Sequence, residues 1–140
     1  MLALPACQLA PTSQRRQVMT VNGLIDAHEM GFTLVHEHLF ADLRSYEEQL
    51  RHNVTVDTDE VSEVVLPYLT AIREFGCRTL IDCTATHLGR HPELIKRLSD
   101  ASGLHMLTTT GGYLSADGRF IAPYVNSDSI EQLAARWTSE

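Results

Sequence analysis

The sequence predicts an α/β fold in which parallel strands alternate with helices. Three apolar segments of strand length, at residues 32–36, 78–84 and 104–110, are each followed by a segment with apolar residues at helical spacing. Strands buried on both faces of a parallel sheet are apolar along their whole length, and this alternation is the pattern of β/α units. A chain of 140 residues with 44% apolar residues is long enough to bury a core.

A short hairpin is expected before the first of these strands. Residues 18–25 have the pattern of two strands around Asn22-Gly23, a dipeptide typical of tight turns. We expect residues 1–16 to be a disordered lead and residues 17–140 to form the domain. Residues 39–56 are polar and irregular and predict a long loop, which in such a position often carries function.

The first helix has clear signals at both ends. Asp57 is a capping residue that precedes further acidic residues, and Gly76 follows the last apolar position of the helical pattern. Pro67 lies inside the pattern, where it lacks a donor for the helical ladder. We therefore expect the helix to be kinked or split in two at Pro67.

Two further helices follow the second and third strands. Pro92 is placed to open one helix and Gly103 to end it. A long loop then leads from the third strand to the last helix. Asp128, with Glu131 three residues later, is expected to cap that helix.

Two histidines, His36 and His38, stand at the end of the first apolar strand with one residue between them. Side chains two residues apart leave a strand from the same face, so the two rings can approach one point. Neutral imidazole is a good ligand for zinc and neighbouring metals. The bare pair fits two exposed or core histidines equally well, but its position at a strand end favours a metal half-site. The active site of a β/α barrel lies at that end of the strands.

Composition excludes several classes of function. The formal charge of −7 argues against nucleic acid or an anionic membrane surface as a partner. No apolar run approaches the roughly 18 residues of a membrane span. The three cysteines form no Cys-x-x-Cys pair, and their odd number predicts reduced thiols and a cytoplasmic location. The cysteines are Cys7, Cys77 and Cys83.

Several segments together resemble the phosphotriesterase family of the metal-dependent amidohydrolase superfamily. The most specific is GFTLVHEHL at residues 31–39, and it is joined by VNGLI at 21–25, RTLID at 78–82, LGR at 88–90 and TTGGY at 109–113. The resemblance implies a (β/α)₈ TIM barrel that holds two divalent metal ions, usually zinc, bridged by a hydroxide. It implies hydrolysis of phosphotriesters, lactones or related esters, hence a small-molecule ester as substrate. A homodimer of the full-length protein is left open.

The resemblance also implies roles for individual residues. His36 and His38 match the strand-1 ligands of the more buried metal. Tyr113 matches an aromatic residue that lines the substrate pocket, and a tyrosine there is more like the lactonase-type members. Asp82 matches an acidic residue behind the ligands, whereas His91 departs from the acidic residue expected at its position.

Other metal ligands of the family have no match in this sequence. The resemblance calls for a carboxylated lysine on strand 4, histidines on strands 5 and 6, and an aspartate on strand 8. The chain has one lysine, Lys96, and it lies inside the second predicted helix. Eight β/α units need roughly 250 residues, so we expect about the first three units here, inactive on their own.

Two alternatives remain open from sequence. A cupin-like all-β metal protein also uses a His-x-His pair, and a non-catalytic metal-binding fragment would need no further ligands. His87 and His91 could chelate a metal from one helical face, but Pro92 makes a helix through both unfavourable.

Overall fold

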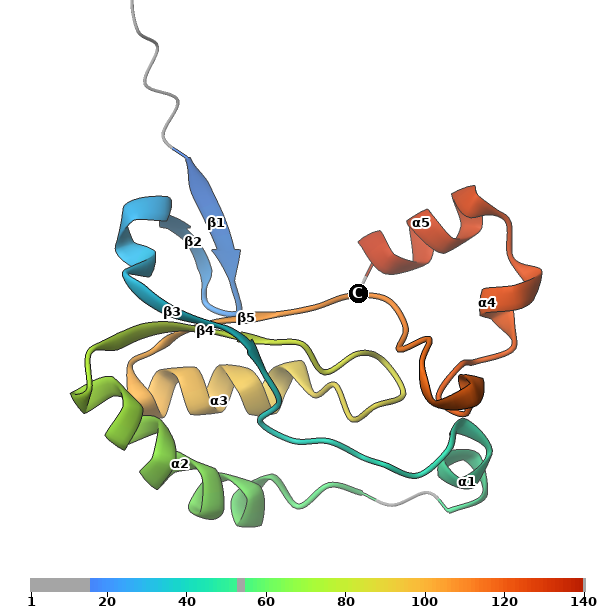
Figure 1. Cartoon of the computed structure of the whole chain (residues 1–140), viewed down its shortest axis with the longest axis horizontal. Helices are drawn as coiled ribbons and strands as arrows, with labels where there is room; N and C mark the ends of the chain where they lie inside the picture. Colours follow the sequence, from blue (N-terminus) through green and yellow to red (C-terminus); the bar gives the residue numbers. More distant parts are fainter. Residues whose placement is uncertain (1–15, 53–54, 140) are drawn as a thin grey trace, which may run out of the picture.

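The computed structural model describes residues 16–52 and 55–139, and it shows an α/β fold built on a parallel sheet (Figure 1). The expected disordered lead falls outside the described residues, apart from Arg16. The carbonyl of Arg16 accepts a hydrogen bond from the amide of Ala27 at 2.7 Å, so Arg16 belongs with the hairpin that follows.

The predicted hairpin is present and is docked on the main sheet. Strands β1 (Gln17–Thr20) and β2 (Gly23–Asp26) pair antiparallel around a turn at Val21 and Asn22. Gly23, the first residue after the turn, has a φ of 108°, which glycine adopts readily. The amide of Val21 donates to the carbonyl of Met106 in the main sheet at 2.9 Å. The turn of the hairpin is therefore fixed to the sheet, while its strands extend away from the helices (Figure 1).

The main sheet confirms the predicted parallel β/α order. Its strands are β3 (Phe32–Glu37), β4 (Cys77–Asp82) and β5 (His105–Thr108), parallel and hydrogen-bonded in that order. Helices α2 (Thr58–Glu74) and α3 (Pro92–Ser102) cover one face of it (Figure 1). Full burial of each large apolar side chain in this layer contributes roughly 1.5–3 kcal/mol. The core consists of Leu69, Cys77, Leu80, Leu94, Ile95, Leu98, Leu104 and Met106.

Helix α2 begins as predicted but is not split. The Asp57 carboxylate accepts hydrogen bonds from two amides of the first turn. Pro67 lies within one continuous helix, so the expectation of a split is wrong. Val61 and Ile72 pack against the core on either side of the proline. Their burial opposes the roughly 3 kcal/mol that an internal proline costs a helix.

The two predicted long loops contain short helices. Helix α1 (Tyr46–Arg51) lies within residues 39–56, where Ser45 and Glu48 form a reciprocal capping box. The loop after β5 contains the 3₁₀ turn η2 (Ala116–Gly118) and the single-turn helix α4 (Tyr124–Ser127). These short elements span too few residues for a helical period to be recognised in the sequence.

The last helix, α5 (Ile130–Thr138), has a different cap from the one predicted. Ser129, not Asp128, is the capping residue, and its partner is Gln132. The Asp128 carboxylate instead accepts a hydrogen bond from Nη2 of Arg136 at 2.8 Å. Helix α5 lies away from the layer formed by α2 and α3 (Figure 1).

The parallel sheet covered by helices contradicts the cupin-like alternative, which requires an all-β jelly roll. Cys77 is buried and Cys83 is half-buried, and both are free thiols, while Cys7 lies outside the described residues. Val35 on β3 is 69% exposed, so part of the sheet is not covered. None of the helices described in the structure is long and apolar enough to cross a membrane.

Candidate metal half-site at the strand ends

The carboxyl ends of the three parallel strands lie side by side. Glu37 at the end of β3 pairs with Asp82 at the end of β4, and Asp82 pairs with Thr108 at the end of β5. The four residues that the sequence assigns to a site lie in these strands or in the segments that follow them. They are His36, His38, Asp82 and Tyr113.

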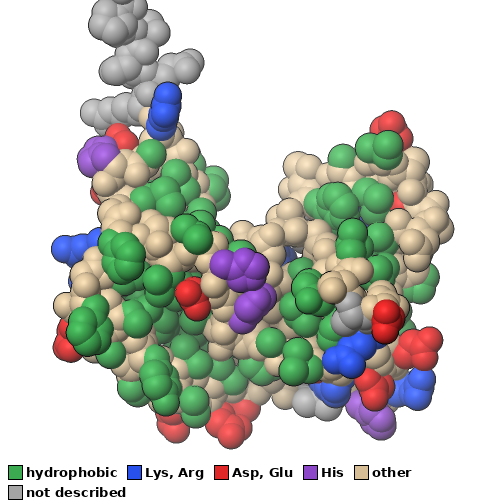
Figure 2. Space-filling model, in the orientation of Figure 1, with side chains coloured by type: hydrophobic (Ala, Val, Ile, Leu, Met, Phe, Trp, Pro, Cys, Tyr) green, Lys and Arg blue, Asp and Glu red, His purple; other side chains and the backbone are tan. Residues whose placement is uncertain are grey.

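A bulge in β3 accompanies the histidine pair. From Leu34 to Glu37 the chain of β3 advances three residues, while the paired stretch of β4, from Leu80 to Asp82, advances two. β3 therefore carries one extra residue in the stretch that includes His36. Leu34, Glu37 and His38 all line a hollow against helix α2. His36 and His38 are exposed, and Figure 2 shows two touching histidine side chains in the middle of one face.

The spacing of the two rings suits a shared metal ion. Their centroids are 5.3 Å apart, and the ring planes are inclined at 69°. Two imidazoles bound to one tetrahedral zinc at about 2.0–2.1 Å, each with a radius of roughly 1.1 Å, have centroids about 5 Å apart. Within residues 16–52 and 55–139, no group of three or more His, Cys, Asp or Glu side chains could hold a metal. The separation of the rings is therefore compatible with one shared metal ion, to which the described residues bring no third ligand.

Asp82 is buried behind the histidines and holds backbone, not the rings. Asp82 is only 1% exposed. One carboxylate oxygen accepts the amide of Leu39 at 2.9 Å and the other accepts the amide of Thr84 at 2.9 Å. The carboxylate thus ties the segment after β3 to the segment after β4.

The sequence did not single out Thr84, although the structure places it against His38. The hydroxyl oxygen of Thr84 lies 3.0 Å from Nδ1 of His38. The only sequence signal is a hydroxyl two residues after Asp82, at the last position of a predicted strand. Such a signal is too common to select one threonine.

Tyr113 lies in the loop after β5, as expected, and is 40% exposed. Its ring meets that of Phe120 edge to face, with the centroids 5.8 Å apart. Phe120 is buried, so the loop is anchored through this contact. Gly111, which precedes the tyrosine with a φ of 89°, lies against the indole of Trp137 in α5.

The other metal-binding candidates have structural roles. The ring of His87 packs edge-on against Tyr46, with the centroids 4.8 Å apart. Nδ1 of His91 accepts the amide of Leu94 at 3.3 Å, so His91 takes the capping role expected of an acidic residue at the start of α3. Nζ of Lys96 donates to Asp100 on the same helix at 2.8 Å, in agreement with its exclusion as a metal bridge.

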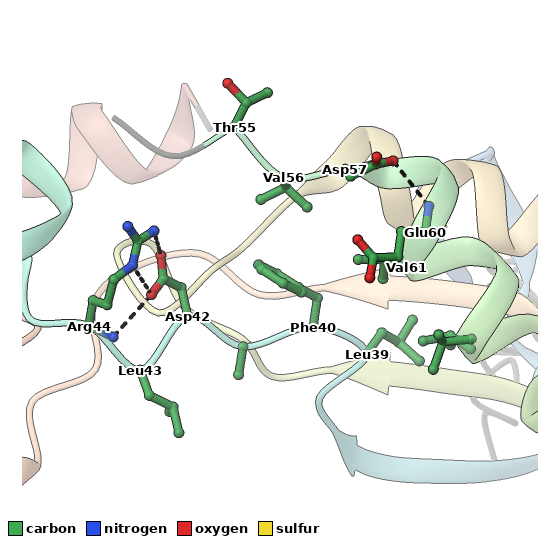
Figure 3. A pocket seen from close by; sticks show the side chains of 13 residues that line it. Leu39, Phe40, Asp42, Leu43, Arg44, Thr55, Val56, Asp57, Glu60 and Val61 are labelled. Atoms are coloured by element: carbon green, nitrogen blue, oxygen red, sulfur yellow. Dashed lines mark hydrogen bonds and ion pairs between the residues drawn. The ribbon is translucent and has the colours of Figure 1, made fainter. Parts of the chain in front are cut away.

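A separate cavity of about 950 Å³ lies between the segment after β3 and the start of α2 (Figure 3). Nε of Arg44 donates to the carboxylate of Asp42 at 2.9 Å on one side of it. The hydrogen bond from Arg44 lowers the pKa of Asp42 below its usual value. Neither His36 nor His38 lines this cavity, so it is distinct from the strand ends. Its lining includes Phe40, Asp42, Arg44, Val56, Glu60 and Val61.

Comparison with known proteins places this arrangement in one family. A model of the phosphotriesterase family matches residues 16–140. The chain is 29% identical over 110 residues to the aryldialkylphosphatase of Saccharolobus solfataricus, which covers 79% of this chain and 33% of that protein.

Solved structures agree with the family match. The organophosphorus hydrolase from Deinococcus radiodurans aligns with a TM-score of 0.63 and 28% identity, over 77% of this chain and 32% of that one. A mutant of a PTE-like lactonase from Deinococcus radiodurans aligns with a TM-score of 0.59 and 30% identity, over 66% of this chain and 29% of that one. The chain therefore spans about a third of the length of these relatives.

Proposed function

This chain belongs to the phosphotriesterase family, and from that premise we propose that its strand ends supply the first two metal ligands of an ester hydrolase. The observation that carries the proposal is the His36–His38 pair, with centroids 5.3 Å apart where β3 ends. The names of the relatives include an aryldialkylphosphatase and a lactonase. The substrates proposed for the whole enzyme are accordingly phosphotriesters, lactones or related esters.

Each residue of the strand ends has a task in this proposal. His36 and His38 would hold one of two divalent metals, with zinc as the metal expected for imidazole ligands. The chemistry that bound metals supply is a water whose pKa is lowered toward neutrality and a polarised phosphoryl or carbonyl oxygen. Asp82 keeps the two strand ends in register, and Tyr113 lines the substrate pocket.

The position of the pair supports this assignment. The three parallel strands and their helices correspond to the N-terminal part of a TIM barrel. Barrel enzymes hold their active sites at the carboxyl ends of the strands, where the pair lies. We also propose a cytoplasmic location, because Cys77 and Cys83 are free thiols.

A chimera tests the proposed function. Residues 16–140 would replace the matching part of the Deinococcus radiodurans hydrolase, whose remaining length would supply the other strands. We expect metal-dependent hydrolysis of a lactone or a phosphotriester that a chelator abolishes. The same chimera with His36→Ala and His38→Ala is the control, and it should fold alike without turnover. A folded, metal-loaded chimera without turnover, or one indifferent to the two substitutions, would refute the proposal.

A further inference from the structure

One side chain behind the histidine pair has no task in the proposed function so far. Thr84 is only 1% exposed, and its hydroxyl oxygen lies 3.0 Å from Nδ1 of His38. His38 itself is exposed. The hydrogen bond therefore joins Nδ1 of an exposed ring to a buried hydroxyl. The other ring nitrogen, Nε2, takes no part in this bond.

The backbone around this bond is held on both sides. The amide of Cys83 donates to the carbonyl of Glu37 at 2.8 Å, directly before His38. The two oxygens of Asp82 accept the amides of Leu39 and Thr84, directly after His38 and at the threonine itself. The positions of the threonine and of the histidine backbone are thus set by hydrogen bonds within the chain.

We propose that Thr84 is a positioning residue, which orients the ring of His38 so that Nε2 is the nitrogen offered to a metal. The inference rests on the proposed function for its purpose, but the ring orientation is independent of it. A neutral imidazole that gives Nε2 to a metal carries its proton on Nδ1. The Thr84 hydroxyl oxygen then accepts that proton in a hydrogen bond, as partners of metal-bound histidines do.

The first test measures the affinity of the 140-residue chain for Co²⁺ or Zn²⁺ alone, by competition with a chromophoric chelator. Thr84→Val keeps the shape and the backbone bond to Asp82 but removes the hydroxyl. We expect it to weaken metal binding by about 10–100-fold. Thr84→Ser, which keeps the hydroxyl, should restore most of the affinity.

A second buried threonine, Thr79 on β4, is the matched control. Thr79 is fully buried, and its hydroxyl donates to the carbonyl of Met30 at 2.6 Å, away from the histidine pair. Thr79→Val should lower the stability of the fold and leave the metal affinity unchanged. Equal affinities in the Thr84→Val and Thr79→Val variants would overturn the inference.

The second test needs no metal. The ring nitrogens of His38 are followed by ¹⁵N NMR in the metal-free chain at a pH where the imidazole is neutral. Their resonances should move in Thr84→Val, return in Thr84→Ser and stay in place in Thr79→Val. Unmoved resonances in Thr84→Val would overturn the inference even if the chain binds metal. If the chain binds no metal and the resonances move as expected, the proposed function fails and the positioning role of Thr84 stands.

Discussion

Removal of the Asp82 carboxylate should loosen both strand ends at once. In Asp82→Ala, the amides of Leu39 and Thr84 lose their acceptors, each of which now lies at 2.9 Å. A buried amide left without a partner costs about 1–3 kcal/mol, and one that water can reach costs less. The Thr84 amide is buried, whereas the bond to Leu39 is only partly buried. Together they predict a loss of about 2–4 kcal/mol in the free energy of unfolding.

Urea unfolding measures the total loss, and amide hydrogen exchange locates it. The amides of Leu39 and Thr84 should exchange much faster in Asp82→Ala, while those in the middle of α3 keep the protection set by global unfolding. Asp82→Asn retains one carbonyl oxygen and should lose protection at one of the two amides. Unchanged exchange at both amides, or a stability within about 0.5 kcal/mol of the native chain, would refute the bridging role.

Three further predictions concern the fold and its activity. Gly89→Ala should destabilise the chain by about 1–3 kcal/mol in urea unfolding, because φ is 105° and the new Cβ would lie 2.6 Å from the Asp42 amide nitrogen. Gly112→Ala is the control: its new Cβ meets no atom within 4 Å, and the change should be nearly neutral. The Asp42 pKa is lowered by Arg44, so this pair stabilises the fold above the unfolded pKa of about 3.9 and ceases to do so as the pH falls through the lower, folded value. Arg44→Ala should therefore lower the unfolding midpoint more at neutral pH than in strong acid, where its bond to the His52 carbonyl is the side-chain hydrogen bond still lost. An equal difference at both pH values would contradict the assignment. The purified 140-residue chain should show no metal-dependent lactonase or phosphotriesterase turnover. Its described residues offer two ligands, whereas catalytic zinc sites generally use three. Turnover that His36→Ala abolishes would contradict this prediction.

Signals that are local in sequence predicted most of the fold. The hairpin around Asn22-Gly23, the three strands and the cap at Asp57 all follow from neighbouring residues and were found where expected. The split at Pro67 was not found, because the packing of distant segments holds α2 together as one helix. At the last helix, Asp128 and Ser129 are both residue types that cap helices. Asp128 forms an ion pair with Arg136, and Ser129 caps α5.

The site was predictable only in part, because some of its contacts join residues that are distant in sequence. The two-residue spacing of His36 and His38 predicts two neighbouring rings, but β3 ends at Glu37 and is bulged at His36, so regular strand alternation does not run through the pair. The contact between His38 and Thr84 spans 46 positions and depends on how β3 pairs with β4. The bulge that brings an extra residue into β3 depends on that pairing too, and no pattern within the strand announces it.

The most direct test of the proposed half-site is a zinc titration of the native chain, beside His36→Ala, His38→Ala and His28→Ala. His28 is an exposed histidine in the 3₁₀ turn before β3, where its ring lies 2.7 Å from the Asp26 carboxylate, and it serves as the control. We predict that either substitution at the pair weakens zinc binding by at least about tenfold. The His28→Ala variant should bind zinc as the native chain does. A native chain that binds no zinc, or three variants with the same affinity, would contradict the assignment of His36 and His38 as metal ligands.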